Sequence, residues 1–280
     1  MATIIQTLQT ILDALDHQLA NETKRIHLKE ALQSLVLDYI YNHPLYRGLN
    51  FYGGTCLHIN YNLNRLSEDI DLDNSQGIRL DHFGDDLLAY FHKHWSYQEI
   101  SLRRQESEQG IIRLTLRFPV LYELGLSPHG DEMLHLKVEI SQHPQSAVIQ
   151  QTPVIHFGRS FVPSHFSLET MMAGKILACL ERSFQIGRTG IAIKGRDFYD
   201  LLWFMQQRIH PLDQKLERDG VESYTVQSAM LVLQEKVGRI KLRDLEIDLL
   251  PLFEQRAFID AWIASFHANF EAFLEFYISS

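Results

Sequence analysis

The chain has 280 residues, of which 45% are hydrophobic and 22% charged, and its net charge at pH 7 is −9. This length allows one large domain or two modest ones with a substantial core. No apolar run approaches the roughly 20 residues that cross a bilayer, and we find no signal peptide, so we expect no membrane association. The acidic balance argues against broad, non-specific binding to nucleic acid. Cys56 and Cys179 lie in apolar helical patterns. We expect both to be reduced core residues, which suits a cytoplasmic protein.

The predicted elements divide the chain into three regions. Apolar residues recur at helical spacing over residues 2–20, and a second helix is expected over residues 25–42. Strands are expected near 70–72, 97–102, 110–118 and 133–140, with a helix between 80 and 95. Later amphipathic runs fall near 168–182, 197–207, 222–236 and 254–276, and Ser167 is placed to cap the first of them. We therefore expect N-terminal helices over 1–45, a mixed α/β core over 46–162 and a helical lobe over 163–280.

The stretch FYGGTCLHINYNLNRLSEDIDLDN, residues 51–74, carries the strongest chemical signal. Gly53, Gly54 and Thr55 precede a segment with helical apolar spacing. Glycines let a backbone approach a ligand closely, and the free N–H groups at a helix start attract phosphate. Thr55 can add a hydroxyl donor. We expect these three residues to bind the phosphates of a nucleotide.

Acidic residues crowd the second half of this stretch, where Glu68, Asp69, Asp71 and Asp73 fall within six positions. Alternate residues of a strand share a face, with Cα atoms about 6.5–7 Å apart. A strand here turns Ile70 and Leu72 toward the core and places Asp69 and Asp71 together on the other face. Two carboxylates at that spacing can hold Mg²⁺, which prefers oxygen ligands and relieves their repulsion.

A third carboxylate is expected from MLHLKVEI, residues 133–140. Its apolar residues face one way in a strand, whereas His135, Lys137 and Glu139 face the other. Glu139 is therefore the candidate for a third acid. Its position beside Asp69 and Asp71 depends on the strand order, which the sequence leaves open.

Structural interpretations compete with each of these motifs. Gly-Gly-Thr alone is a common turn, and Asp-x-Asp alone is usually a solvated strand end. His58 and His135 belong to no zinc-like grouping and are interpreted as structural or surface residues. The aromatic run Phe198, Tyr199, Trp203 and Phe204 is interpreted as helix core, with Tyr199 alone considered for contact with a nucleobase. The ordered combination of the glycine and aspartate motifs nevertheless favours a site for a Mg²⁺-nucleotide.

This combination resembles the nucleotidyltransferase AbiEii/AbiGii toxin family, whose pattern is Gly-Gly-Thr/Ser, about ten residues, then Arg-x-Ser-x-Asp-[Ile/Leu/Phe]-Asp-Leu. The matching residues are Gly53, Gly54, Thr55, Arg65, Ser67, Asp69, Ile70, Asp71 and Leu72. GKILACLERSFQIGRTGIAIKGRDFYDLLWF, residues 174–204, is similar to the family's lysine-bearing helix and the Arg-Asp-x-Tyr-Asp-Leu helix that follows it. The two matches cover most of residues 48–205.

The resemblance implies an α+β fold, with a polymerase-β-like nucleotidyltransferase core containing a mixed sheet, N-terminal helices and a C-terminal helical lobe. It implies that Gly53, Gly54 and Thr55 hold the triphosphate of an NTP substrate, while Asp69, Asp71 and Glu139 bind Mg²⁺. Glu139 would also help to activate the incoming hydroxyl. Two metal ions would stabilise the attacking and leaving oxygens as pyrophosphate departs.

The resemblance also makes Lys175 and Asp197 functional residues of the helical lobe. Lys175 and Arg182 are about two turns apart and share a helical face. Lys175 would steady the β- and γ-phosphates as negative charge develops on the pyrophosphate. Asp197 would orient a base or the acceptor.

Three further charged residues have open roles. Asp200 is expected either to support Asp197 or to pair with Arg196. A purely structural arginine–aspartate network at the helix start is an equally open interpretation for Arg196 and Asp200. Arg65 is expected to pair with the acidic cluster or to position Ser67, rather than to act in catalysis.

The function implied is that of a toxin in a toxin–antitoxin or abortive-infection pair, which transfers NMP from an NTP to RNA. The 3′ acceptor end of tRNA is the acceptor that the resemblance suggests, and a cognate antitoxin protein is an expected partner. The segment 182–196 contains Arg182, Arg188, Lys194 and Arg196 without an acid and is a candidate for holding RNA backbone. Two alternatives stay open: transfer of NMP to a protein hydroxyl of the antitoxin or a host factor, and a nucleotide-binding regulator without turnover.

Overall fold

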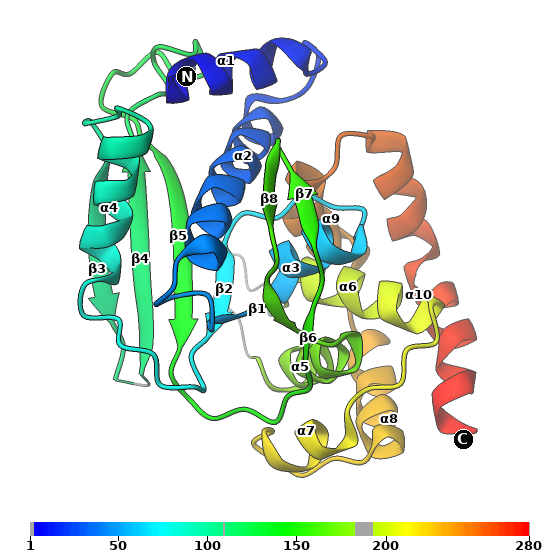
Figure 1. The fold of residues 1–280 in the computed structure, drawn as a ribbon. Helices are drawn as coiled ribbons and strands as arrows, with labels where there is room; N and C mark the ends of the chain where they lie inside the picture. Colours follow the sequence, from blue (N-terminus) through cyan, green and yellow to red (C-terminus); the bar gives the residue numbers. More distant parts are fainter. Residues whose placement is uncertain (1–2, 109, 183–192, 280) are drawn as a thin grey trace. The chain divides into compact units, whose positions relative to one another are not determined.

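The computed structural model describes residues 3–108, 110–182 and 193–279 (Figure 1). The chain forms two compact units. The sheet unit comprises residues 1–144 and 150–165, and the helical unit comprises residues 145–149 and 166–280. The N-terminal helices, expected as a region of their own over 1–45, lie in the same unit as the core. Among the helices that the structure describes, none combines the length and apolar character needed to cross a bilayer.

The sheet unit contains the helices α1 (Ile4–Ala14), α2 (Asn21–Asn42), α3 (Gly53–Tyr61) and α4 (Phe83–His94). A capping box starts α1, because Thr3 accepts from the Gln6 amide while the Gln6 side chain accepts from the Thr3 amide. This first helix is shorter than the expected 2–20. The Asp16 side chain accepts a hydrogen bond from the Gln18 amide, a local turn that competes with helical pairing.

A seven-stranded mixed sheet has the order β3-β4-β5-β2-β1-β9-β6. Its strands are β1 (Asn50–Tyr52), β2 (Ile70–Asp73), β3 (Ser101–Glu106), β4 (Ile111–Phe118), β5 (Leu134–Ser141), β6 (Ile149–Gln151) and β9 (Ser164–Phe166). The β2–β5 and β1–β9 pairs are parallel, whereas β1–β2, β3–β4 and β4–β5 are antiparallel. β7 (Val154–His156) and β8 (Arg159–Phe161) form a separate two-stranded sheet.

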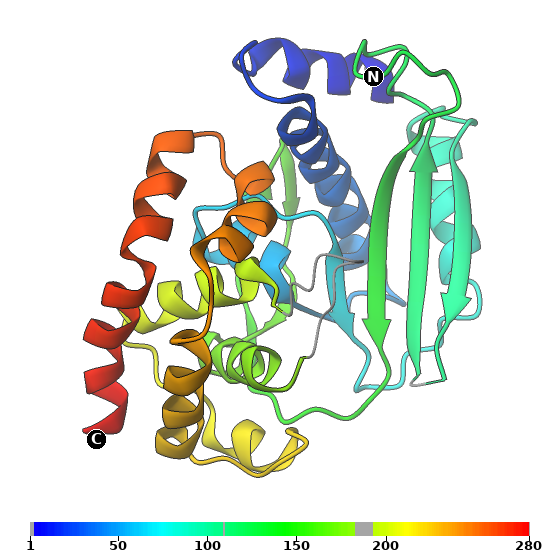
Figure 2. The ribbon, with the colours of Figure 1, turned by 180° about the vertical axis from the view of Figure 1, so that it is seen from behind.

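One face of strands β3, β4 and β5 builds the core of the sheet unit. Apolar side chains of β4 and β5 alternate with polar ones, and Leu114, Leu116, Leu136, Val138 and Ile140 are completely buried. Helices α2 and α4 lie on this face (Figure 1), and Gly84 of α4 approaches Leu102 and Leu114. Figure 2, seen from behind, shows the opposite face of β3–β5 with no helix of the same unit drawn over it. The alternation expected for residues 110–118 and 133–140 thus separates a buried face from an open polar one.

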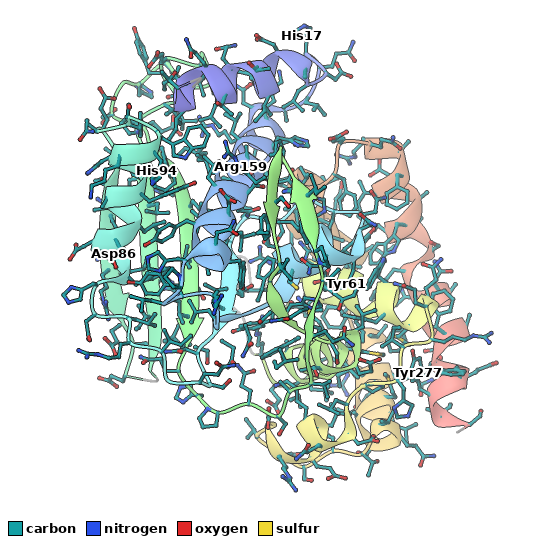
Figure 3. The ribbon with its side chains drawn as sticks, viewed as in Figure 1. His17, Tyr61, Asp86, His94, Arg159 and Tyr277 are labelled. Carbon is teal, nitrogen blue, oxygen red and sulfur yellow. The ribbon has the colours of Figure 1, made fainter. Side chains whose placement is uncertain are left out.

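Strand β3 occupies Ser101–Glu106, later than the expected 97–102. Tyr97 and Ile100 are buried in the loop before it, so their apolar character reflects core packing and not strand pairing. Arg159 of β8 is labelled in Figure 3. Its guanidinium lies 4.8 Å from the centroid of the Trp95 ring, and this cation–π contact joins the β7–β8 hairpin to the end of α4.

The helical unit contains α5 (Leu168–Glu181), α6 (Gly195–Gln206), α7 (Asp213–Arg218), α8 (Val226–Val237), α9 (Leu242–Leu249), a 3-10 turn η1 (Leu250–Leu252) and α10 (Arg256–Ile278). Phe198 packs edge-on against Phe266, and the Tyr199 ring contacts Phe253 and Trp262. Tyr199 is buried, so the nucleobase contact considered for it is wrong and the core interpretation holds. Tyr277 of α10 donates its hydroxyl to the Ile209 carbonyl at 2.8 Å (Figure 3).

Both cysteines are reduced and buried, as expected. Burial raises the pKa of the Cys56 and Cys179 thiols well above the ordinary value. A thiol held neutral in this way is a poor nucleophile. The two side chains therefore act as small apolar core residues.

Ser167 caps α5, as the sequence predicts, because its hydroxyl accepts from the Thr170 amide at 3.3 Å. We expect Ser167→Ala to lower the free energy of unfolding by about 1 kcal/mol, measured by urea denaturation, since a buried helix-start amide loses its acceptor. Ser265→Ala is the matched control, because that hydroxyl donates to carbonyls of its own helix and caps nothing. Equal midpoints for the two variants would contradict the capping role.

Candidate active site

Two glycines bring the start of α3 against the side chains of the acidic stretch. Gly53 has φ +80°, and a Cβ atom added there would lie 2.2 Å from Asp71 Oδ2. A Cβ atom on Gly54 would lie 2.4 Å from Arg65 Nη2 and 3.0 Å from Ser67 Oγ. Only glycine combines the left-handed conformation at position 53 with this close approach. The first backbone N–H groups of α3 and the Asp71 carboxylate are therefore neighbours.

The Thr55 hydroxyl has a structural use that the sequence does not reveal. Thr55 is 0% exposed, and its Oγ1 donates to the Asp69 carbonyl at 2.5 Å while lying 2.9 Å from Ser67 Oγ. The hydroxyl therefore ties α3 to the residue that precedes β2, instead of pointing toward a ligand. Arg65 is also buried, and its Nη1 donates to the Leu66 carbonyl at 3.0 Å. Both side chains support the backbone that carries Asp69.

The strand order left open by the sequence puts Glu139 next to Asp71. Strands β2 and β5 run parallel, and Asp71 and Glu139 are Cα partners. Ile70 and Leu72 are completely buried, so Asp69 and Asp71 lie on the opposite side of the chain. The side chains of Asp69 and Glu139 are 29% and 28% exposed. Three partly exposed carboxylates thus lie on the same open face of the sheet, on neighbouring strands.

Basic side chains offset the repulsion among these acids. Glu139 Oε1 lies 2.6 Å from Arg113 Nε, and Asp69 Oδ1 lies 3.9 Å from Lys137 Nζ. The hydrogen bond from Arg113 to Glu139 raises the pKa of the guanidinium. Among the residues that the structure describes, no three His, Cys, Asp or Glu side chains are already gathered as metal ligands. Glu139 is turned to Arg113, so it must rotate to share an ion with the aspartates.

The other two acids of the stretch have structural partners. Asp73 is buried and accepts hydrogen bonds from Asn50 Nδ2 at 3.0 Å and from the Ser75 amide at 3.2 Å. Glu68 lies before the strand and pairs with Lys29 at 2.6 Å. Only Asp69 and Asp71 of the four therefore face the open side with partly exposed carboxylates.

The histidines interpreted as structural or surface residues do lie in such settings. His58 Nε2 contacts Glu30 Oε1 at 2.8 Å, and its Nδ1 lies 2.9 Å from the Leu63 carbonyl. Burial alone would lower the pKa of His58, but the hydrogen bond to Glu30 outweighs it and the pKa is raised. This pair joins α2 to α3. His135 is exposed on β5.

Lys175 and Asp197 meet in the helical unit, in a buried ionic cluster. Lys175 Nζ lies 2.8 Å from Asp197 Oδ1 and 2.7 Å from Asp200 Oδ2, and Arg182 Nη1 lies 3.1 Å from Asp197 Oδ2. Asp200 is 0% exposed and pairs with Lys175, so its expected alternative pairing with Arg196 is not observed. The shared face of Lys175 and Arg182 is confirmed by their common contact with Asp197.

Opposing effects act on Asp197. Burial alone would raise its pKa, but the charges of Lys175 and then Arg182 outweigh burial and hold the pKa well below its usual range. Asp197 is therefore an ionised, buried carboxylate between two cations. Such a group fixes the start of α6 and holds the ammonium of Lys175 in place.

The start of α6 has one further partner that the sequence does not reveal. The Arg196 amide donates to Asp248 Oδ2 of α9 at 2.9 Å. Asp248 thereby satisfies a free helix-start amide from a position far along the chain. Of the basic segment 182–196, Arg188 lies outside the described residues. Lys194 is half-buried, and burial followed by repulsion from Arg196 and Arg182 lowers its pKa.

The close approach at Gly53 predicts a stability difference between two glycine variants. Gly53→Ala forces the Asp71 carboxylate away and strains a left-handed residue, so we expect it to lower the free energy of unfolding by about 3 kcal/mol or more. Gly77 has φ +66° and nothing within 4 Å of an added Cβ, so Gly77→Ala should lower it by only about 1 kcal/mol. Urea unfolding of both variants measures the difference, and equal losses would contradict it.

The buried cluster predicts a pH-dependent defect. In the wild type, the lowered pKa means that the contribution of Asp197 to stability is complete above its unfolded value near 3.8 and is lost as pH falls toward the folded pKa. Lys175→Met leaves two buried carboxylates short of a cation. The free energy of unfolding at pH 7 should fall by about 3–5 kcal/mol. Protonation relieves this, so the deficit should shrink toward pH 4.

The control for that variant is Arg239→Met. Arg239 forms an exposed ion pair with Glu235 on the surface of the same unit. Such pairs contribute at most about 1 kcal/mol, and this variant should show no comparable pH dependence. Urea unfolding at pH 7.5 and pH 4.5 measures both variants. If Lys175→Met loses no more unfolding free energy than Arg239→Met at either pH, the buried cluster does not stabilise the fold as expected.

Comparisons with known proteins identify the family and the fold of the chain. The family model "Nucleotidyl transferase AbiEii toxin, Type IV TA system" matches residues 36–279. None of the curated proteins matches the chain in sequence. JHP933 from Helicobacter pylori has a similar fold, with a TM-score of 0.51 and 16% identity over 92% of this chain and 94% of that one. A second H. pylori protein, assigned provisionally as a nucleotidyltransferase, gives a TM-score of 0.53 and 18% identity over 93% and 96% of the two chains. The chain therefore belongs to the AbiEii family of nucleotidyltransferase toxins of type IV toxin–antitoxin systems.

Proposed function

We propose that this nucleotidyltransferase transfers NMP from an NTP to RNA in a Mg²⁺-dependent reaction, with the 3′ acceptor end of tRNA as its target. The observation that carries the proposal is the pairing of Asp71 with Glu139, beside Asp69 and against the start of α3. Carboxylates and helix-start amides then lie together on one partly exposed face. We expect the reaction to take place in the cytoplasm, under the control of the cognate antitoxin that the family implies.

The residues present fit a divalent cation. The donors are the carboxylates of Asp69, Asp71 and Glu139, which are the oxygen ligands that Mg²⁺ prefers. Mg²⁺ bound there would supply charge stabilisation for the attacking and leaving oxygens. Glu139 would leave Arg113, turn toward Asp71 and accept the proton of the acceptor hydroxyl. The backbone amides that follow Gly53 would hold the phosphates of the NTP.

The Thr55 hydroxyl would position a metal-binding residue in this mechanism instead of donating to a phosphate. Its side chain holds the Asp69 carbonyl, so it would position a metal-binding carboxylate, while its backbone amide stays at the helix start. Gly53 and Gly54 would serve the phosphates by keeping that helix start clear of side-chain atoms. The triphosphate site would therefore be formed chiefly by backbone.

Lys175 and Asp197 would form a second functional pair in the helical unit. Lys175 would contact the β- and γ-phosphates, and Asp197 would orient a base or the acceptor. The ammonium already has two carboxylate partners, at 2.8 and 2.7 Å. A phosphate contact therefore has to share or displace one of them. Asp197 would retain Arg182 as a cation if Lys175 turned to a phosphate, whereas Asp200 is 0% exposed and would lose a buried ion pair.

Asp71→Asn should abolish transfer, lowering the rate by about a thousandfold, because it removes a charge from the centre of the carboxylate group. Purified protein is incubated with each labelled NTP, Mg²⁺ and total tRNA, and label on RNA is measured. Asp81→Asn is the control, since Asp81 is exposed and pairs only weakly with Arg79 at 3.3 Å. EDTA should stop labelling and added Mg²⁺ should restore it.

The same incubation separates the alternatives. Absence of label on RNA with all four nucleotides would overturn RNA as the acceptor. Label that migrates with protein would instead assign the acceptor as a protein hydroxyl. Equal labelling by wild type and Asp71→Asn would remove the carboxylate mechanism altogether.

A further inference from the structure

The open face of strands β3, β4 and β5 carries an ordered arrangement of charge. Cα partners across antiparallel strands have their side chains on the same face, so the register assembles this face in rows. The first row contains two of the candidate catalytic acids and consists of Gln105, Arg113, Glu139 and Asp71. The second row contains Arg103, Thr115 and Lys137, and the third contains Ser101, Arg117 and His135. Successive rows are about 6.5–7 Å apart along the strands.

The acids of this face lie in the first row and at the β2 edge, where Asp69 is 3.9 Å from Lys137 of the second row. On β3, β4 and β5 themselves, the second and third rows contain three permanent cations, one histidine and no carboxylate. In a chain with net charge −9, this is a local inversion of sign. A positive field there also acts on His135, whose pKa is lowered by burial and then by the charges of Arg117, Lys29 and Lys137. The face therefore runs from carboxylates to cations over three rows.

The cations of the two outer rows are available to a ligand. Arg103 is exposed, and the Lys137 side chain is 47% exposed. Within the described part of the chain, neither Arg103 nor Arg117 forms an ion pair. Arg117 is half-buried, and its Nε is covered by protein atoms. No helix of the sheet unit covers this face (Figure 2). Arg103 and Arg117, held on rigid strands without a carboxylate partner, are suited to bind an anion, and Lys137 adds a cation that a carboxylate contacts only at 3.9 Å.

We propose that this open face of β3, β4 and β5, termed the strand platform, docks the sugar-phosphate backbone of the RNA acceptor and leads its reactive end to Asp69, Asp71 and Glu139. The inference rests on the proposed function, because it assigns the path of that acceptor. Arg103, Arg117 and Lys137 bind phosphates, while the acidic row receives the terminal hydroxyl.

The chemistry of the platform favours RNA over an acidic protein. Arginine forks bind phosphate oxygens in pairs, and cations repeated along strands match the regular charges of a nucleic-acid backbone. Protein interfaces have an apolar, often aromatic centre. None of the exposed large hydrophobic residues among the described residues lies in β3, β4 or β5. Lys137 lies 3.9 Å from Asp69, so the basic surface is continuous with the candidate catalytic centre.

The test uses the double variant R103Q/R117Q and leaves Lys137 unchanged because of its contact with Asp69. Filter binding with end-labelled total tRNA, over a salt series, measures the dissociation constant. We expect affinity to fall about tenfold or more at moderate salt and the slope of log K against log salt to decrease by about 1.5. Equilibrium dialysis with labelled NTP and Mg²⁺ should give wild-type nucleotide binding, since neither arginine contacts the acids.

Two controls separate charge from folding. R103K/R117K keeps both charges and should retain most of the affinity for tRNA. R239Q/R243Q removes two exposed charges of the helical unit and should leave tRNA binding unchanged. A thermal melt checks that all three variants fold. If R103Q/R117Q binds tRNA as tightly as the wild type, or no more weakly than R239Q/R243Q, the platform is not the docking surface.

Binding and transfer fail separately in this design. Wild-type labelling of RNA together with unaltered tRNA binding by R103Q/R117Q would overturn the platform and leave the proposed function intact. If R103Q/R117Q binds tRNA more weakly but the wild type transfers no label, the proposed function is overturned and the platform is still a tRNA-binding surface. If the wild type labels a protein, and R103Q/R117Q loses that labelling while it still binds tRNA normally, the platform binds an acidic protein and the RNA inference is overturned.

Discussion

Three carboxylates on one sheet face set the main electrostatic constraint on the candidate site. Asp69, Asp71 and Glu139 are brought together by the parallel pairing of β2 with β5. Like charges on neighbouring strands repel, so the arrangement needs opposite charge nearby. Arg113 and Lys137 provide it in the structure. A divalent ion would provide it during the proposed reaction.

Contacts of the neighbouring backbone and side chains fix the positions of these carboxylates. Thr55 ties the start of α3 to the Asp69 carbonyl, and the absence of a side chain at Gly53 lets the same helix start lie against Asp71. Asp73 and Glu68 have structural partners of their own, Asn50 and Lys29. Neighbouring acids of one short segment therefore have different roles. The backbone conformation and the core, and not the acids themselves, decide which carboxylates face outward.

Patterns within single elements were predictable, whereas pairings between distant segments were not. Alternation identified β4 and β5 and the outward direction of Glu139, and helical spacing identified α5, α6 and α10. The neighbour of Glu139, the contact of Lys175 with Asp200, and the cap that Asp248 gives to α6 all join segments far apart in sequence. Three-residue strands such as β1 and β7 are too short to produce a periodic signal. The Thr55 hydroxyl turned inward because a buried donor must find an acceptor.

Net charge is a poor guide to the surfaces of this chain, because its charges are sorted by strand register. An overall value of −9 argues against non-specific nucleic-acid binding, yet the permanent charges that β3, β4 and β5 place in the outer rows of the strand platform are all positive. Screening at physiological salt acts over about 8 Å, so a phosphate on these rows responds to nearby arginines and far less to acids elsewhere. The same acidic average repels nucleic acid from the rest of the surface. On the proposed function, a local basic face on an acidic protein would therefore favour the one orientation that brings an RNA end to the carboxylates.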